Sequence, residues 1–99
     1  MSLSYNLLLA TDRSPEDVLE AAAETGTYDR VGGALRGEGV TVFASAPSAF
    51  SRSVALEDVG LDASVSVVFE LHRDARDAGE RAALEAAYAL ALEADGAFL

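Results

Sequence analysis

Three side chains near the middle of the chain have the types and the spacing needed for acid–base or metal chemistry. Glu70, His72 and Asp74 alternate along the sequence, so on an extended strand all three would lie on one face. Two carboxylates around a titratable imidazole can bind a metal ion or exchange protons with a substrate. Against this, a lone histidine beside Arg73 is typical of an exposed strand end. A small ligand- or metal-binding domain is therefore kept as an alternative function.

Other catalytic and cofactor-binding patterns are missing from the sequence. The chain has no cysteine and no lysine, which excludes thiol nucleophiles, Cys-ligated metals, Schiff bases and a phosphate-loop lysine. Ser48, Ser51 and Ser53 offer hydroxyl groups, but no Gly-x-Ser-x-Gly motif accompanies them. The glycines near Arg36 form neither a phosphate loop nor a dinucleotide-binding pattern. We predict no enzyme activity, no cofactor and no catalytic or metal-binding residue.

Acidic side chains form two groups that a protein partner could bind. The first is a stripe of three glutamates spaced four residues apart on a predicted helix, where they repel one another without local compensation. The second group flanks a predicted strand. An acidic stripe is also typical of an ordinary solvated helix face, and this remains the competing interpretation. The candidate partner-binding residues are Glu16, Glu20, Glu24, Glu57, Asp58 and Asp62.

The overall charge narrows the class of partner. Seventeen acidic side chains against seven arginines give a formal net charge of −10, which disfavours binding to nucleic acids. Such a charge favours encounter with basic proteins, although acidic composition is also common in bacterial cytosolic proteins. No apolar run reaches the roughly 18 residues of a membrane span, and the first residues lack the features of a secretory signal. We therefore expect a cytoplasmic protein with no membrane contact.

One strand, expected within residues 62–73, organises the predicted fold. Val65, Val67, Phe69 and Leu71 occupy every second position, so all four side chains point to one face of a sheet. The opposite face is mostly polar, which is typical of an antiparallel sheet with one face in water.

The N-terminal third predicts a strand followed by a helix. Leu3–Thr11 alternates and is apolar on both faces near its end, which indicates an interior strand. Ser14 is a typical helix N-cap, and Pro15 suits the first helical position because its missing N–H needs no partner there. We expect this helix to run to about Thr25 and to end at Gly26 in the left-handed conformation.

The middle of the chain predicts a hairpin and a long connection. Tyr28–Arg36 and Gly39–Ala46 are its two expected arms, closed by Gly37-Glu38, with Gly39 available for a positive φ. Ala46–Asp62 is predicted as a connection in which Val54–Val59 forms a short turn or strand.

The C-terminal third predicts a long helix over Glu80–Ala94, then a short strand at Ala97–Leu99. With 99 residues, the chain has room for one domain, residues 1–99. We predict an α+β fold of order β-α-β-β-β-α, in which two helices cover one face of a mainly antiparallel sheet of about four strands. The residues of the last helix expected to face the sheet are Leu84, Ala87, Tyr88, Ala91 and Leu92.

Several stretches carry a family resemblance along nearly the whole chain. They are Tyr5–Asp12 (YNLLLATD), Ser14–Leu19 (SPEDVL), Gly39–Val42 (GVTV), Leu56–Leu61 (LEDVGL), Val65–Leu71 (VSVVFEL) and Asp95–Leu99 (DGAFL). In this order they resemble the Sit-type immunity proteins, which protect bacteria from the toxins of their own contact-dependent swarm-inhibition systems. The resemblance implies a non-catalytic bacterial protein that neutralises a cognate toxin by binding it.

Two departures from the family pattern bear on the partner and on assembly. Members tend to carry basic residues after the phenylalanine that matches Phe69, where this chain has Glu70 and His72, so partner specificity does not carry over. Members also continue with an Asn-Gly hairpin and a further strand, which implies that this chain is a member shortened at its C-terminus, a fragment, or a member of a different branch. A strand left bare near Phe98 and Leu99 favours a homodimer through that edge, or a self-associating structural module, as a further alternative.

Overall fold

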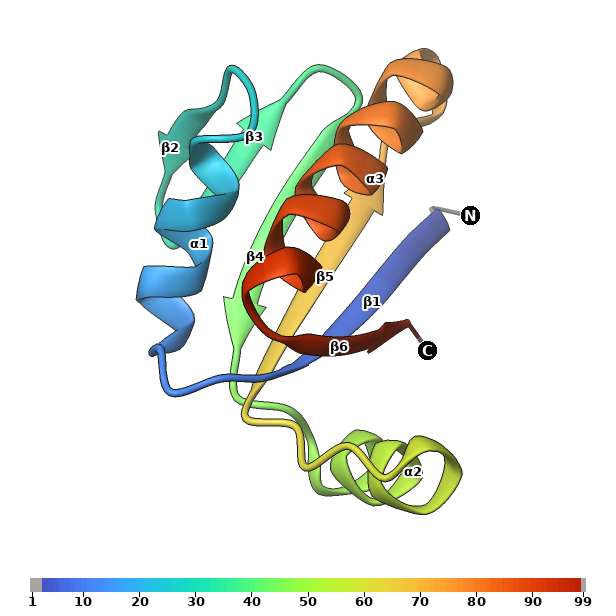
Figure 1. Ribbon diagram of the computed structural model, residues 1–99. Coiled ribbons are helices and arrows are strands. Elements are labelled where there is room, and N and C mark those ends of the chain that lie inside the picture. Colours follow the sequence, from blue (N-terminus) through green and yellow to red (C-terminus); the bar gives the residue numbers. More distant parts are fainter. Residues whose placement is uncertain (1–2, 99) are drawn as a thin grey trace.

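The computed structural model describes residues 3–98, without the side chains of residues 97 and 98. These residues form a six-stranded sheet of order β2-β3-β4-β5-β1-β6 in which every neighbouring pair is antiparallel (Figure 1). The predicted α+β class and antiparallel sheet are confirmed, and the sheet is larger than expected. The strands are β1 (Leu3–Ala10), β2 (Asp29–Val31), β3 (Ala34–Gly37), β4 (Val40–Ser45), β5 (Val65–Leu71) and β6 (Asp95–Phe98). The helices are α1 (Pro15–Ala23), α2 (Ala49–Val59) and α3 (Arg76–Glu93), the last preceded by a 3₁₀ turn at Arg73–Ala75.

The main core lies between the sheet and two helices that cover one face of it. Figure 1 shows α1 and α3 side by side on this face, which we call the helix-covered face. The four alternating apolar residues of β5 are all buried there, as predicted. The strand β1 lies between β5 and β6, so the interior position expected for it is confirmed. Alternation along the two neighbouring strands therefore positions the helices.

The opposite face of the sheet is only partly open to water. Glu70 is exposed there, as the polar pattern predicted. Ser66 is 6% exposed, however, and its hydroxyl donates a hydrogen bond of 2.7 Å to Oδ1 of Asn6 on the adjacent strand. The buried polar group is thus satisfied within the sheet.

The helix α1 begins as predicted and ends differently. The hydroxyl of Ser14 accepts the backbone N–H of the third helical residue at 3.2 Å, and Pro15 is the first helical residue. The expected left-handed end at Gly26 is wrong, because Gly26 has no positive φ. Instead, Thr25 donates from its N–H at 3.1 Å and from its hydroxyl at 2.7 Å to the carbonyl of Ala22. These two bonds satisfy the carbonyl of Ala22, one of the last carbonyls of the helix. In a left-handed helix end, backbone N–H groups after the helix have this role.

The predicted hairpin consists of two hairpins. The arm expected over Tyr28–Arg36 is wrong, because Gly32 and Gly33 form a tight turn that divides it into β2 and β3. Gly32 takes a φ of +61°, which glycine adopts without a Cβ clash. The second arm is confirmed as β4, and Gly39 before it has the expected positive φ, +76°.

The helix α2 occupies a region that was predicted as a connection. The prediction for Ala46–Asp62, with a turn or strand at Val54–Val59, is therefore wrong. The helix has clear local signals at both ends. The hydroxyl of Ser48 accepts the N–H of Ser51 at 3.1 Å, and Gly60 ends the helix in the left-handed conformation at a φ of +69°.

A second, smaller core holds α2 against the sheet. The side chain of Leu8 points away from the helix-covered face, to which Leu7 and Leu9 point. Ala55 of α2 is fully buried against it. This helix therefore packs on the opposite side of the sheet from α1 and α3. The small core consists of Leu8, Ala55, Leu61 and Ala63.

The helix α3 presents a different face to the sheet from the one predicted. Of the five residues expected to face the sheet, Ala87 is buried, whereas Ala91 is exposed. Leu84, Tyr88 and Leu92 are 52%, 69% and 70% exposed. The prediction for these four residues is wrong. The buried residues of α3 are Gly79, Ala83, Ala86, Ala87 and Leu90.

A close approach of two backbones explains this orientation. A Cβ atom added at Gly79 would overlap the carbonyl group of Gly39, and one added at Gly39 would overlap the carbonyl of Ala75. Only small side chains fit where the helix lies this near to the sheet. Alanine and glycine therefore fill most of the buried face, with Leu90 as its one large residue, and Leu84, Tyr88 and Leu92 lie outside.

The strand β6 follows α3 directly and pairs with β1, from Leu7 opposite Phe98 to Ala10 opposite Asp95. A short last strand is therefore confirmed, beginning two residues before the predicted Ala97–Leu99. Leu99 lies outside the described residues. Within residues 3–98, β2 and β6 form the two edges of the sheet.

Candidate binding surface

The acidic stripe on α1 is partly neutralised by a residue from the sheet. Arg30 of β2 forms ion pairs with Glu16 and with Glu20, the latter at 2.9 Å. Arg30 pairs in register with Leu35, which is buried on the helix-covered face, so its side chain lies on the same side as α1. The prediction that these two glutamates lack local compensation is wrong. All three charged groups remain partly exposed.

The third glutamate of this stripe has no such partner. Glu24 is exposed at the C-cap of α1 and joins no ion pair among the described residues. It lines a groove of about 200 Å³ between α1 and α3, together with Glu93, which pairs with Arg13 at 2.9 Å. The last turn of α1 contains no basic residue. A carboxylate at this end of a helix faces the negative end of the helix dipole, so a cation is favoured there.

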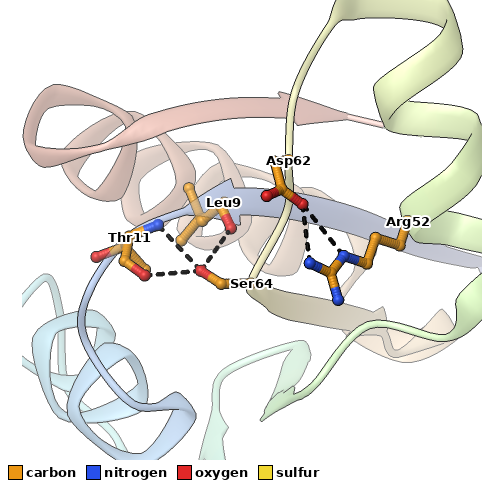
Figure 2. Close-up of polar contacts among 5 residues, drawn as sticks. All are labelled: Leu9, Thr11, Arg52, Asp62 and Ser64. Carbon is orange, nitrogen blue, oxygen red and sulfur yellow. Dashed lines mark hydrogen bonds and ion pairs between the residues drawn. The ribbon is translucent and has the colours of Figure 1, made fainter.

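The second acidic group lies around the end of α2. Arg52 of α2 donates from Nε at 3.2 Å and from Nη2 at 3.0 Å to Oδ1 of Asp62, as Figure 2 shows. Glu57 and Asp58 are exposed in the last turn of α2, which contains no basic residue. Neither joins an ion pair within residues 3–98. Asp62 is thus partly neutralised, and the other two are not.

A serine fixes the loop that carries Asp62. The hydroxyl of Ser64 accepts the N–H of Thr11 at 3.0 Å and lies 2.7 Å from its carbonyl, to which it can donate (Figure 2). The N–H of Ser64 also donates to the carbonyl of Leu9 at 2.8 Å. These bonds hold the loop before β5 to the end of β1, so the hydroxyl has a structural role.

The two acidic groups lie on separate helices and their flanking loops. Figure 1 shows α1 on the helix-covered face and α2 beyond the end of β1, well separated from α1 in the view. The packing of Ala55 on Leu8 places α2 toward the opposite side of the sheet. Arg13 and Glu93 lie between the two groups, because they line both the groove beside Glu24 and a hollow of about 650 Å³ that Asp62 also lines.

The residues proposed for metal or acid–base chemistry are not brought onto one face. The strand β5 ends at Leu71, and Asp74 lies in the 3₁₀ turn, so the alternation that would align Glu70, His72 and Asp74 stops. Nε2 of His72 lies 2.8 Å from the hydroxyl of Thr41 in a hydrogen bond. Among the described residues, no group of three or more His, Cys, Asp or Glu side chains is placed to hold a metal ion.

A pocket of about 310 Å³ lies between the end of α1, the β3–β4 turn and α3. Tyr28, Glu38, Arg81 and Glu85 are among its lining residues. Burial raises the pKa of the Tyr28 phenol above 10.0; a hydrogen bond with Thr25 opposes this effect, and the charge of Glu85 adds to it. The sequence did not predict this pocket, because its walls come from three separate segments and no motif links them.

None of the helices within residues 3–98 is both long enough and apolar enough to cross a membrane. No curated protein and no solved structure matches the chain. A family model described as SitI3-like matches residues 3–99, which confirms the resemblance seen in the sequence motifs. The chain therefore belongs to the SitI3-like family, a family of Sit immunity proteins.

Proposed function

We propose that this protein is a non-catalytic immunity protein that neutralises a cognate toxin in the bacterial cytoplasm by binding it through an acidic surface. Membership of the SitI3-like family supports the immunity role. The formal net charge of −10 supports a basic region of the toxin as the surface that is bound.

The position of the unpaired carboxylates is the main support for this proposal. Glu24 caps the C-terminus of α1, and Glu57 and Asp58 lie in the last turn of α2, with no basic residue in either last turn. Each carboxylate near the negative end of a helix dipole is unfavourable by roughly 0.3–1 kcal/mol when exposed. A cationic side chain of a partner would remove this repulsion. These carboxylates therefore destabilise the free protein slightly, and a cationic partner would stabilise them in a complex.

The α1 group is the better candidate of the two. Glu24 lines the same groove as Glu93, and the neighbouring pocket beyond the end of α1 is lined by Glu38 and Glu85. Two carboxylates and one arginine therefore line each of these two hollows. In the α2 group, Asp62 lines a hollow with Asp12 and Glu93, but Asp62 and Glu93 are each paired with an arginine. We assign the toxin contact to the α1 side and treat the α2 group as its matched control.

The toxin domain is first identified among the products of the genes beside this one, and calorimetric titration against it then tests the assignment. One variant carries Glu16→Gln, Glu20→Gln and Glu24→Gln; the other carries Glu57→Gln, Asp58→Asn and Asp62→Asn. Both variants remove three charges and break ion pairs to an arginine, so their effects on net charge are equal.

We expect the α1 variant to bind at least about tenfold more weakly and with a shallower salt dependence, because close charge pairs set affinity. The α2 variant should bind within about threefold of the wild type, because it loses only long-range attraction. Equal losses in both variants would show that net charge alone matters. Absence of binding by the wild type at low salt would contradict the proposed function itself.

A homodimer through β6 is a second proposal, compatible with the first. Within residues 3–98, this strand pairs on one side only, with β1, and its other edge is available for a further strand. Light scattering that gives the mass of one 10.3 kDa chain at high micromolar concentration would rule it out.

A further inference from the structure

The helix α3 carries its largest apolar side chains on its outer surface. Leu84, Tyr88 and Leu92 lie four residues apart, so they form one continuous line along the helix, which we call the α3 apolar row. All three side chains are more than half exposed. Contiguous exposed apolar surface is uncommon on soluble monomers and marks interaction sites.

The close approach of α3 to the sheet fixes the orientation of the helix. Gly79 meets the backbone of Gly39, and the alanines that follow on the same face are buried. Rotating α3 to bury the apolar row would replace these small residues by two leucines and a tyrosine. The close approach at Gly79 leaves no room for them. The row is therefore a built-in feature of the folded surface.

The acidic pocket adjoins this row. Arg81 and Glu85 line the pocket, and on the helix each lies three residues, or about one turn, before a residue of the row, Leu84 and Tyr88 respectively. Glu38 lines the pocket from the β3–β4 turn. Within the described part of the chain, neither glutamate joins an ion pair. The lining thus holds two carboxylates and one guanidinium, that of Arg81, and its formal charge is −1. This negative hollow beside an apolar row suits a basic side chain that projects next to an apolar contact.

The charge of the chain indicates whether a second copy or a different protein binds to the apolar row and the pocket. A second copy would bring another formal charge of −10 and would place its own carboxylates beside these. A basic protein matches both the apolar row and the acidic pocket. The complementarity therefore favours a basic partner.

We propose that the α3 apolar row and the adjoining pocket form the surface on which the cognate toxin docks, with Tyr88 as the central anchor and a toxin lysine or arginine in the pocket. This assignment rests on the proposed function and specifies its binding face. Large aromatic side chains at the centre of an interface commonly carry most of the binding energy. The carboxylates of α1 then lie at the rim, where they steer the encounter.

The test compares three variants in calorimetric titrations against the purified toxin domain encoded beside the gene. Tyr88→Ala and Leu92→Gln change the row, and Phe50→Ala is the control, because Phe50 is an aromatic residue of α2 that is 78% exposed. Thermal unfolding of each variant checks that the fold is retained. We expect Tyr88→Ala to raise Kd at least about thirtyfold and Leu92→Gln at least about fivefold, as for anchor residues of an interface. Phe50→Ala should change it less than about twofold.

The outcomes separate this inference from the function on which it rests. If the wild type binds the toxin domain and the row variants bind equally well, the inference is overturned and the proposed function stands. If the wild type does not bind, the proposed function fails first. If light scattering shows a wild-type dimer that Tyr88→Ala converts to a monomer with unchanged toxin affinity, the row is a self-association surface and the inference is overturned.

Discussion

Replacement of Gly79 by alanine tests the packing that sets the orientation of α3. Gly79 lies in the first turns of α3 and is buried. Helix propensity alone predicts that Gly→Ala in a helix interior stabilises a protein by about 1 kcal/mol. The structure predicts the opposite sign, because the added methyl group would overlap the carbonyl group of Gly39.

The loss of stability in Gly79→Ala depends on which atoms would have to move to admit the methyl group. The clash is with backbone atoms, so no change of rotamer relieves it. The carbonyl of Gly39 also accepts the N–H of His72 at 2.8 Å, which holds the β3–β4 turn in place. Overpacking by one methyl group costs about 1–3 kcal/mol, and we take the upper end for a backbone contact. After the gain in propensity, the net loss is about 2 kcal/mol, or roughly 8–16 °C in Tm for a domain of this size.

Thermal and urea unfolding followed by circular dichroism measure this loss directly. The control is Gly33→Ala, because an added Cβ at Gly33 has no atom within 4 Å and its φ is not positive. This control should stay within about 0.5 kcal/mol of the wild type. If Gly79→Ala is as stable as the wild type or more stable, the close contact and the outward orientation of the α3 apolar row are both wrong.

Three further predictions concern single side chains. Arg30→Gln removes the exposed ion pairs to Glu16 and Glu20 and should lower the free energy of unfolding by less than about 1 kcal/mol, with the difference fading at high salt; a larger, salt-independent loss in urea unfolding would contradict this. Ser48→Ala removes the N-cap of α2 and should cost about 1 kcal/mol, whereas an unchanged urea midpoint would show that the cap is not used. Burial raises the pKa of the Tyr28 phenol in the folded state, so the phenol stabilises the fold fully below about pH 10, and this contribution is lost as the pH rises through the folded-state pKa. If the free energy of unfolding falls equally with pH in Tyr28→Phe, this prediction is wrong.

The strongest parts of the fold were predictable because local and tertiary signals agree there. In β5 the period of two coincides with complete burial of every second residue. At α1 the Ser14 cap and Pro15 mark the start without any need for tertiary information. The family motifs span these same elements, so the predicted α+β class did not depend on the weaker segments.

The helix α2 shows that capping residues alone do not predict a helix when no hydrophobic pattern accompanies them. Ser48 and Gly60 are ordinary helix-capping residues, and both were visible in the sequence. Between them, Ala55 is the one buried residue of the helix, so no apolar stripe distinguishes a helix from a loop. The packing of α2 depends on Leu8, about fifty residues away in the sequence.

The candidate site depended on contacts between distant segments. Pairing of Arg30 with the α1 glutamates requires β2 to lie beside α1, and the sequence predicted no separate β2. The apolar row was assigned to the core because Leu84, Tyr88 and Leu92 have the spacing of a buried stripe. The competing buried face is made of Gly79, three alanines and a single leucine, Leu90, and hydrophobicity alone underestimates such a face. Close packing, which depends on residue size, decided the orientation.

Survival of cells that express the toxin is a direct test of whether this protein neutralises it. The toxin domain encoded beside this gene is expressed in a sensitive bacterium with the wild-type protein, with Tyr88→Ala or with an unrelated acidic protein, and surviving colonies are counted. We expect that the wild type restores colony numbers, that the unrelated protein does not, and that Tyr88→Ala protects poorly although it is folded. Killing that is equally strong with and without the wild-type protein would contradict the proposal that this chain neutralises that toxin.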